Sequence, residues 1–349
     1  MPSLNFMTGE DPLSLDRIRS VLIRLEDTII FSLIERAQFA HNPRIYQRGA
    51  FKELVDLGFE GSWLEWFLKE TESFHGALSS IHLEFVLTSG LATTTFSESS
   101  KIHQVSCFLE LAASSILTKK SPLSTSSPDE YPFTTDLPSP VLQPLNFPSI
   151  LHPNKVNANA SIFSFYTNAI VPRITRRATL ALSAKKRANG ITGSEEFEDD
   201  GNYGSAATLD VEVLQSISKR VHYGKFVSES KFQANPGAFI PHIQTRNREA
   251  LEALITKPEV EQRLLRRLDK KATTYAQDIA ADGEAPAYNG LSPGKGVNAS
   301  SKIDVDGVVD LYESYIIPLT KEVEVDYLLN RLEGLSQEEI DKLAQLTSS

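Results

Sequence analysis

The chain has 349 residues but only one cysteine, Cys107. One cysteine excludes a framework of disulfide bonds and a zinc site built on several thiolates. An excess of positive charge is also missing, because 35 lysine and arginine residues stand against 45 aspartate and glutamate residues, which gives a net charge of −10. Nucleic-acid binding generally requires a strong positive field, so this balance disfavours it. A small anion can still bind where a few cations gather.

Long hydrophobic runs are absent as well. The longest apolar stretch, residues 105–117, contains Glu110 and is shorter than the roughly 20 residues that a membrane-spanning helix needs. The first residues show no basic start followed by an apolar run, which is the pattern of a signal peptide. The sequence therefore predicts a soluble protein of the cytoplasm that binds no membrane.

Several motifs of common enzyme classes are missing. The chain has no P-loop, no GxGxxG, no HExxH and no GxSxG, and no two of its seven histidines are three or four residues apart. A helical metal site of the usual kind needs such spacing, and a hydrolase needs a nucleophile beside a base. Metal and hydrolytic chemistry are therefore disfavoured.

The apolar residues that are present recur at helical spacing, while alternating strand patterns are almost absent. In residues 11–36, for example, Ile18, Leu25, Ile29 and Leu33 fall on one helical face. We therefore predict an all-α fold, a single multi-helix domain resembling a helical bundle. The expected helices cover residues 11–36, 63–75, 160–189, 209–232, 256–279 and 305–332.

Two cations share one face of the predicted helix at 209–232. Arg220, Gly224, Val227 and Lys231 are spaced i, i+4, i+7 and i+11, so the glycine lies between the cations. Glycine costs about 1 kcal/mol relative to alanine inside a helix, which suggests that another group approaches the backbone closely there. On spacing alone, the alternative is two cations that reach into solvent from the edge of the helix.

Polar residues adjoin the apolar face of the last predicted helix. Thr320 and Glu324 are spaced i, i+4 beside Ile316 and Val323. Glu324 is either an edge residue paired with Lys321 or a partly buried acid whose pKa burial raises.

Four further residues draw attention near helix starts. Thr256 and Glu259 match a T-x-x-E capping box. Glu261 lies in the first turn of the same predicted helix, where the helix dipole favours a negative charge. Arg19 lies beside the apolar face of the first helix, and for this residue taken alone an ordinary surface position is the leading explanation.

Three long segments together resemble the eukaryotic, yeast-type chorismate mutases. The similarity covers roughly residues 13–78 and 127–335, and its most specific parts are LDRIRSVLIRLEDTIIFSLIERAQFAHNPRIY, GNYGSAATLDVEVLQSISKRVHYGKFVSESKFQ and IIPLTKEVEVDYLLNRLE. The resemblance implies an all-helical homodimer that converts chorismate to prephenate, a step of phenylalanine and tyrosine biosynthesis, without a cofactor. It also implies inhibition by tyrosine and activation by tryptophan.

The resemblance assigns roles to six residues. Two arginines would bind the carboxylates of chorismate, a lysine and a protonated glutamic acid would contact its ether oxygen, a second glutamate would accept from the ring hydroxyl, and a threonine would donate a hydrogen bond. The implied catalytic residues are Arg19, Arg220, Lys231, Glu261, Thr320 and Glu324. One position departs from the family pattern, because Lys257 stands where the yeast form has an asparagine.

The resemblance also implies an effector site, but part of it is missing. The matching effector positions are Asp27, Leu78, Asn202, Gly204, Ser205 and Thr208. The family's pair of adjacent arginines is replaced by residues 79–126, a stretch of 12 serines and 6 threonines without a family counterpart. This insertion is either translated non-coding sequence or a lineage-specific loop. Asp304 stands at the family's switch threonine, so we expect weakened regulation by tyrosine and tryptophan.

A second function class remains open from the sequence. The chain could be a non-catalytic helical dimer or a regulatory scaffold that the insertion has disabled. The six polar residues argue against this alternative, because a scaffold has no need for cations at Arg220 and Lys231.

Overall fold

The computed structural model of the chain describes residues 11–78, 131–135, 137, 150–191, 195–277 and 301–345. These residues form helices and no strand, apart from one isolated bridge between Gln277 and Ser301. The all-α prediction is confirmed. None of the described helices is long and apolar enough to cross a membrane. The elements are α1 (Leu15–Arg36), η1 (Pro43–Tyr46), α2 (Lys52–Asp56), α3 (Trp63–Leu78), α6 (Asn159–Phe165), η2 (Tyr166–Ile170), α7 (Val171–Ile174), α8 (Arg176–Ala188), η3 (Glu195–Glu198), α9 (Tyr203–His222), α10 (Gly224–Ala234), α11 (Pro236–Gln244), α12 (Arg248–Ile255), α13 (Pro258–Tyr275), α14 (Val305–Leu311), η4 (Tyr312–Ile316), α15 (Ile317–Leu329) and α16 (Gln337–Gln345).

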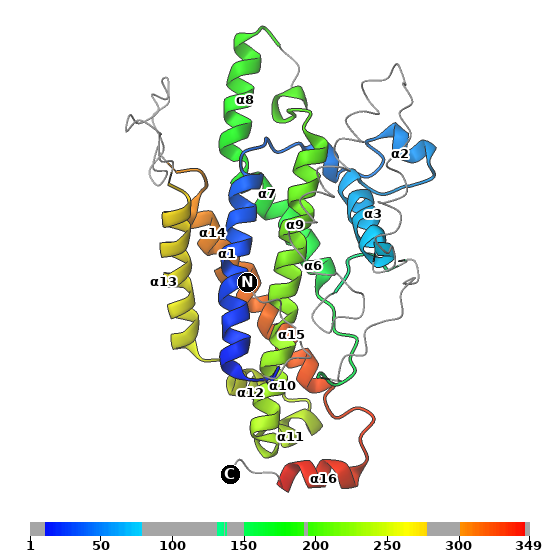
Figure 1. The fold of residues 1–349 in the computed structure, drawn as a ribbon, viewed down its shortest axis with the longest axis vertical. Coiled ribbons are helices and arrows are strands. Elements are labelled where there is room, and N and C mark those ends of the chain that lie inside the picture. Colours follow the sequence, from blue (N-terminus) through cyan, green and yellow to red (C-terminus); the bar gives the residue numbers. More distant parts are fainter. Residues whose placement is uncertain are drawn as a thin grey trace, which may run out of the picture.

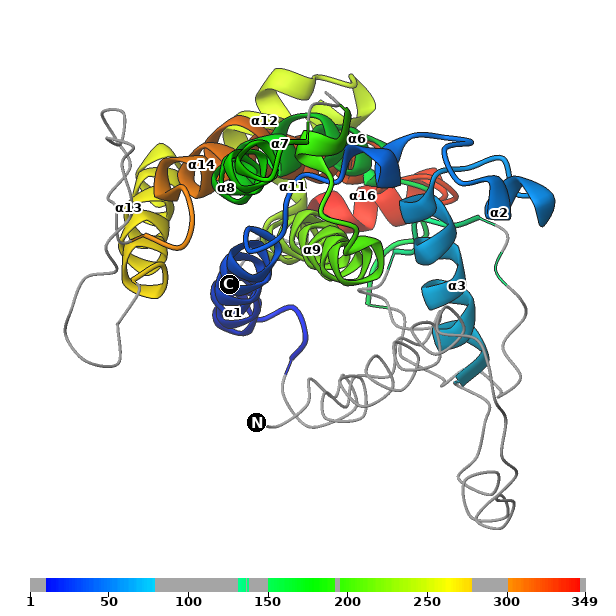
Figure 2. The same ribbon diagram turned by 90° about the horizontal axis from the view of Figure 1, so that it is seen from above.

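Helices α1 and α9 form an antiparallel pair at the centre of the molecule (Figure 1). Arg36, at the end of α1, bonds to Asp210 near the start of α9, while Ile18 at the beginning of α1 packs with Tyr223 just beyond the end of α9. The spacing that predicted α1 is reflected in its burial, since Ile29 and Leu33 are fully buried. Seen from above, α13 and α3 flank the pair on opposite sides, and α6, α7, α8 and α14 lie across it as a second layer (Figure 2).

Two long helices each contain a wider turn directly before a proline. The π-helical turns η2 and η4 are followed by α7, which holds Pro172, and α15, which holds Pro318. Proline has no N–H to donate and its ring crowds the preceding turn, so a wider turn relieves the conflict without ending the helix. The predicted helix at 160–189 continues from α6 through η2 into α7 and is interrupted only at Thr175, before α8. The helix predicted at 305–332 continues from α14 through η4 into α15.

The structure corrects two other predictions from the sequence. The predicted helix at 209–232 is two helices, α9 and α10, that join at Tyr223. The capping box at Thr256 is wrong, because α13 begins after Lys257 and the buried hydroxyl of Thr256 has no hydrogen-bond partner in the described structure. An unpredicted helix, α12, ends at Ile255 and places Thr256 at its C-terminal cap instead.

The proposed insertion, residues 79–126, lies outside the described residues, as do Cys107 and the loop at 282–300. The chain on either side of the insertion is joined by direct contacts. Glu72 on α3 accepts hydrogen bonds from the backbone N–H groups of Phe133 and Thr134, at 2.9 and 2.8 Å. Helix α3 is therefore tied to the segment that follows the insertion.

A buried ion pair joins the end of α1 to α9. The Arg36 guanidinium donates to Asp210 at 2.8 Å, and both side chains are completely buried. The hydroxyls of Tyr46 and Tyr166 donate to the same carboxylate at 2.6 and 2.7 Å. Burial alone would lower the pKa of Arg36, but the charge of Asp210 raises it above its usual value.

This network generates a stability prediction. Replacement of Asp210 by asparagine leaves the Arg36 charge buried without its counter-ion, and we expect a loss of about 3–5 kcal/mol in the free energy of unfolding. Urea unfolding at pH 7 measures it. Asp269→Asn, at an exposed position of α13, is the matched control and should change the free energy by less than about 0.5 kcal/mol. Equal effects of the two substitutions would contradict the assigned role.

Candidate active site

The candidate site is centred on a close contact between α10 and α15. Gly224 is the first residue of α10, and a methyl group placed on it would lie 2.8 Å from Cγ of Glu324 and 3.0 Å from Cγ2 of Thr320. Only the absence of a side chain at Gly224 lets these two residues approach the backbone. The close approach that the sequence suggested at this glycine is therefore present, and the groups that make it are two of the predicted site residues.

Glu324 is a buried acid and not an edge residue. Only 8% of the residue is exposed. Burial raises the pKa of Glu324 to about 7, and the nearby charges of Lys231 and Arg220 partly oppose this shift. The charge of Glu261 acts in the same direction as burial. At neutral pH this carboxyl group can therefore hold a proton and donate a hydrogen bond.

Helices α9 and α10 bring two cations to this acid. Arg220 is 5% exposed, and its Nε atom is buried without a hydrogen-bond partner among the described residues. Lys231 donates from Nζ to the backbone oxygen of Ile255, at the end of α12. Burial lowers the pKa of Lys231, the charge of Glu324 opposes this, and the nearby charges of Lys257 and Arg19 lower the pKa further. An unpaired buried guanidinium N–H beside a desolvated amine is a suitable environment for an anion.

Helix α13 contributes Glu261 from its first turn. Its carboxylate pairs with Nζ of Lys321 at 2.8 Å, and Lys321 also lies 4.0 Å from Glu252 of α12. The sequence alternative that paired Lys321 with Glu324 is therefore wrong, because Lys321 points to the acids of the neighbouring helices. Lys231 and Arg220, on α10 and α9, exert the larger opposing effects on the pKa of Glu324, and Lys321 a smaller one.

The remaining two predicted residues adjoin the cluster less directly. Thr320 is 8% exposed and donates its hydroxyl to the backbone oxygen of Ile316 at 2.6 Å. Arg19 pairs with Asp16 at 2.9 Å on its own helix, and its side chain is 65% exposed. Its charge nevertheless acts on Lys231, so the open end of α1 lies within electrostatic reach of the cluster.

Two buried basic residues at the bend between α9 and α10 were not singled out from the sequence. Burial lowers the pKa of Lys225 to about 7, and Lys225 lies 4.0 Å from the ring centre of Tyr131. Burial, followed by the charge of Lys225, lowers the pKa of His222 to about 3. His222 accepts a hydrogen bond from the backbone N–H of Ala158 at 2.9 Å. No local sequence pattern reveals the burial of Lys225 and His222, because their partners Tyr131 and Ala158 lie far away along the chain.

The predicted effector positions do not meet within one chain. Asp27 faces α13, where it pairs with Lys271 at 2.7 Å and accepts from the Tyr275 hydroxyl at 3.1 Å. It lies nine residues, roughly 13 Å, before Arg36 along α1. Four of the other effector positions lie at the start of α9, on the far side of the Arg36–Asp210 contact from Asp27; they are Asn202, Gly204, Ser205 and Thr208. The remaining one, Leu78, is the last residue of α3.

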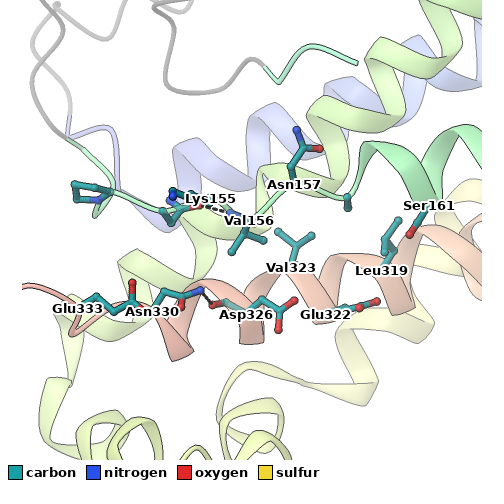
Figure 3. A pocket seen from close by; sticks show the side chains of 13 residues that line it. Lys155, Val156, Asn157, Ser161, Leu319, Glu322, Val323, Asp326, Asn330 and Glu333 are labelled. Carbon is teal, nitrogen blue, oxygen red and sulfur yellow. Dashed lines mark hydrogen bonds between the residues drawn. The ribbon is translucent and has the colours of Figure 1, made fainter. Parts of the chain in front are cut away.

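A groove of about 740 Å³ lies on another face of α15, against residues 153–158 (Figure 3). From α15, Leu319 and Val323 contribute apolar side chains to it, and Glu322 and Asp326 line it as well. None of the six predicted catalytic residues lines this groove. Because α15 turns by about 100° per residue, its groove face and the face that carries Thr320 and Glu324 are different sides of one helix.

Taken together, the cluster places the buried Arg220, the half-buried Lys231, a buried acid and a second carboxylate around one small region. In the part of the chain that the structure describes, no group of three or more histidine, cysteine or acidic side chains is arranged to hold a metal ion. The arrangement can bind a small dianion and donate hydrogen bonds to an oxygen atom on which negative charge develops.

Comparison with known proteins identifies relatives over almost the entire chain. The family model of type II chorismate mutases matches residues 202–325. The chorismate mutase of Emericella nidulans is 37% identical over 341 residues, which cover 96% of this chain and 99% of that protein. The structure of the Candida albicans chorismate mutase Aro7p in complex with L-Trp aligns with a TM-score of 0.65 at 32% identity and covers 97% of this chain and all of that one. The structure of the chorismate mutase AtCM1 with tyrosine in its allosteric site aligns with a TM-score of 0.62 at 34% identity, covering 93% of this chain and 99% of that one.

The contact at Gly224 generates a prediction about packing. In Gly224→Ala the new methyl group must displace Glu324 and Thr320, so we expect the variant to be less stable than the wild type although alanine is the better helix former by about 1 kcal/mol. Denaturant unfolding measures this. The same substitution in a Glu324→Ala background should cost clearly less, because the nearest obstructing atom is gone. Equal costs in the two backgrounds would contradict the contact.

Proposed function

Since the chain belongs to the chorismate mutase family of fungi and yeasts and catalyses the conversion of chorismate to prephenate, we propose that the reaction takes place in the cluster around Glu324. The observation that carries the proposal is the burial of Glu324 beside Lys231 and Arg220, three side chains from three different helices. The non-catalytic alternative is not favoured, because buried cations without a functional partner would only destabilise the fold.

The reaction itself needs positioning and charge stabilisation. In this intramolecular rearrangement the ether C–O bond of chorismate breaks while a new C–C bond forms within the same molecule, and no proton or electron is exchanged with the protein. The enzyme therefore has to hold the dianion in a compact conformation and stabilise the negative charge that develops on the ether oxygen.

Each proposed residue has a role that follows from its chemistry. Arg220 binds one carboxylate of the substrate through its planar guanidinium, and Arg19 turns from Asp16 to the other carboxylate. Lys231 and protonated Glu324 donate to the ether oxygen. The Thr320 hydroxyl adds a hydrogen bond, and Glu261 accepts one from the ring hydroxyl. Lys257 stays outside this set, although its charge acts on Lys231.

The proposed role of Glu324 predicts a particular pH dependence. Because the pKa of Glu324 is raised to about 7, its carboxyl group loses the donated proton as the pH rises above 7, and activity should fall. Glutamine donates from its amide at every pH. We therefore expect Glu324→Gln to retain activity and to show a flatter decline between pH 7 and 9. Rate measurements over this range test it, and a decline identical to that of the wild type would exclude the protonated carboxyl group.

We also propose that regulation is altered in this protein. Two of the similar structures carry tryptophan or tyrosine, which supports amino-acid effectors for this chain. Here the effector position Asp27 is bound to Lys271, and Asp304, at the switch position, is held by Arg173 at 2.9 Å. The arginine pair is replaced by residues 79–126. These differences support weak responses to tyrosine and tryptophan, and a cytoplasmic homodimer remains a prediction from the resemblance.

The insertion and the regulation can be tested in one set of assays. Glu72 ties α3 to the segment after the insertion, so a chain without residues 79–126 should fold and consume chorismate at a rate within about twofold of the full chain. Neither chain should change its activity by more than about twofold with tyrosine or tryptophan. Strong responses of the full chain to both amino acids would contradict the altered regulation, and absence of turnover in both chains would favour the scaffold alternative.

A further inference from the structure

Helices α10 and α15 run side by side with their residue numbers rising together. At the upper contact, Gly224 lies against Thr320 and Glu324. One turn later, the Ser228 hydroxyl donates to the backbone oxygen of Glu324 at 3.1 Å. The next contact along both helices is made by Glu229 with two residues near the end of α15. Successive turns of one helix therefore meet successive turns of the other.

Glu229 is a buried carboxylate that plays no part in the proposed reaction. The residue is 1% exposed. Its oxygens accept from the Tyr327 hydroxyl at 2.6 Å, from Nε and Nη2 of Arg331 at 2.6 and 2.9 Å, and from the Gln233 amide at 2.8 Å. Four donors to one buried carboxylate satisfy it completely, and the charged and bidentate bonds among them are the strong and directional kind. Glu229 therefore fixes how far α10 can slide along α15.

Both partners of Glu229 are themselves held in place. The Tyr327 hydroxyl accepts a hydrogen bond from the backbone N–H of His152 at 2.9 Å, in the segment that runs beside α15. The guanidinium of Arg331 also lies over the ring of Phe232, 4.6 Å from its centre. Lys231 lies between Glu229 and Phe232 in sequence, so the residues on both sides of this lysine are bound to the end of α15.

We infer that Glu229 and Tyr327 are positioning residues that fix the axial register of α10 on α15 and thereby hold Lys231 at Glu324. The inference rests on the proposed function of that pair. A slide by a single residue moves one helix by 1.5 Å along the other, which is half the length of a hydrogen bond and a large error for groups that must meet one oxygen atom.

The inference is tested by removing one hydroxyl group. Tyr327→Phe keeps the ring and its packing but removes the bond to Glu229, and we expect kcat to fall by about tenfold. The pH dependence should shift as well. Glu324 is faced by Lys231, Arg220, Glu261 and Lys321, and only Lys231 lies on α10, so its retreat raises the pKa of Glu324. The alkaline decline in kcat therefore moves to higher pH.

A matched control separates positioning from stability. Tyr46→Phe removes a hydroxyl that donates to another buried carboxylate, Asp210, at the same distance of 2.6 Å. It should lower the melting temperature without moving the alkaline decline. Arg331→Lys is a second test, because it keeps the charge but loses the two-pronged contact, and it should shift the decline in the same direction as Tyr327→Phe.

The outcomes distinguish this inference from the proposed function. If Tyr327→Phe and Arg331→Lys lower only the melting temperature while the wild type retains its alkaline decline, Glu229 and Tyr327 are structural and the inference is wrong. If Glu324→Gln and the wild type have the same pH profile, the proposed roles of Glu324 and Lys231 are wrong instead. A shift of the alkaline decline in both Tyr327→Phe and Arg331→Lys, and none in Tyr46→Phe, supports the inference.

Discussion

The exclusion of water from the carboxyl group of Glu324 is the constraint on which the rest of the site depends. A buried acid beside Arg220 and Lys231 experiences two opposed effects, because burial favours its neutral form and the cations favour its anion. The balance sets its pKa close to neutrality. Small changes in the distance to either cation would move this balance, so a site of this kind needs a scaffold that fixes several helices relative to one another.

The helices meet this requirement by different means. Gly224 removes a side chain so that α10 and α15 can touch, and the Glu229 cluster fixes their register further along. The wide turn before Pro318 lets the chain continue as a helix from α14 into α15, so Thr320 and Glu324 are presented on a continuous rod. At the other end of α9, the Arg36–Asp210 pair anchors α1. Disrupting any of these interactions would lower the stability of the fold, because a buried unpaired charge or a steric conflict would remain.

The sequence predicted the fold where a local pattern decided the outcome. The apolar stripe of α1 is a single amphipathic face, and its residues are buried as the spacing requires. Helices α11 and α12 were missed. In α11, Pro236, Gly237 and Pro241 resemble loop residues, although Pro236 occupies the first turn, where proline is tolerated, and Pro241 lies inside the helix. Thr256 satisfied the capping pattern but belongs to the end of a preceding helix, because tertiary packing extended α12 to Ile255.

The partners of the site residues could not be predicted from local sequence patterns either, because they too are set by tertiary packing. Sequence spacing indicated that something approaches Gly224 but not what, and the resemblance to a family, not periodicity, selected the six residues. Lys321 pairs with Glu261 and not with the nearby Glu324, because the carboxylate of Glu261 on α13 is better placed.

The central claim is that the carboxyl group of Glu324 is protonated and donates a hydrogen bond to a bound dianion. Calorimetric binding of prephenate at pH 8 in buffers of different ionisation enthalpy measures proton uptake directly. The account predicts clearly greater proton uptake by the wild type than by Glu324→Gln, with a difference approaching one proton per site, and equal uptake by the two proteins would contradict it.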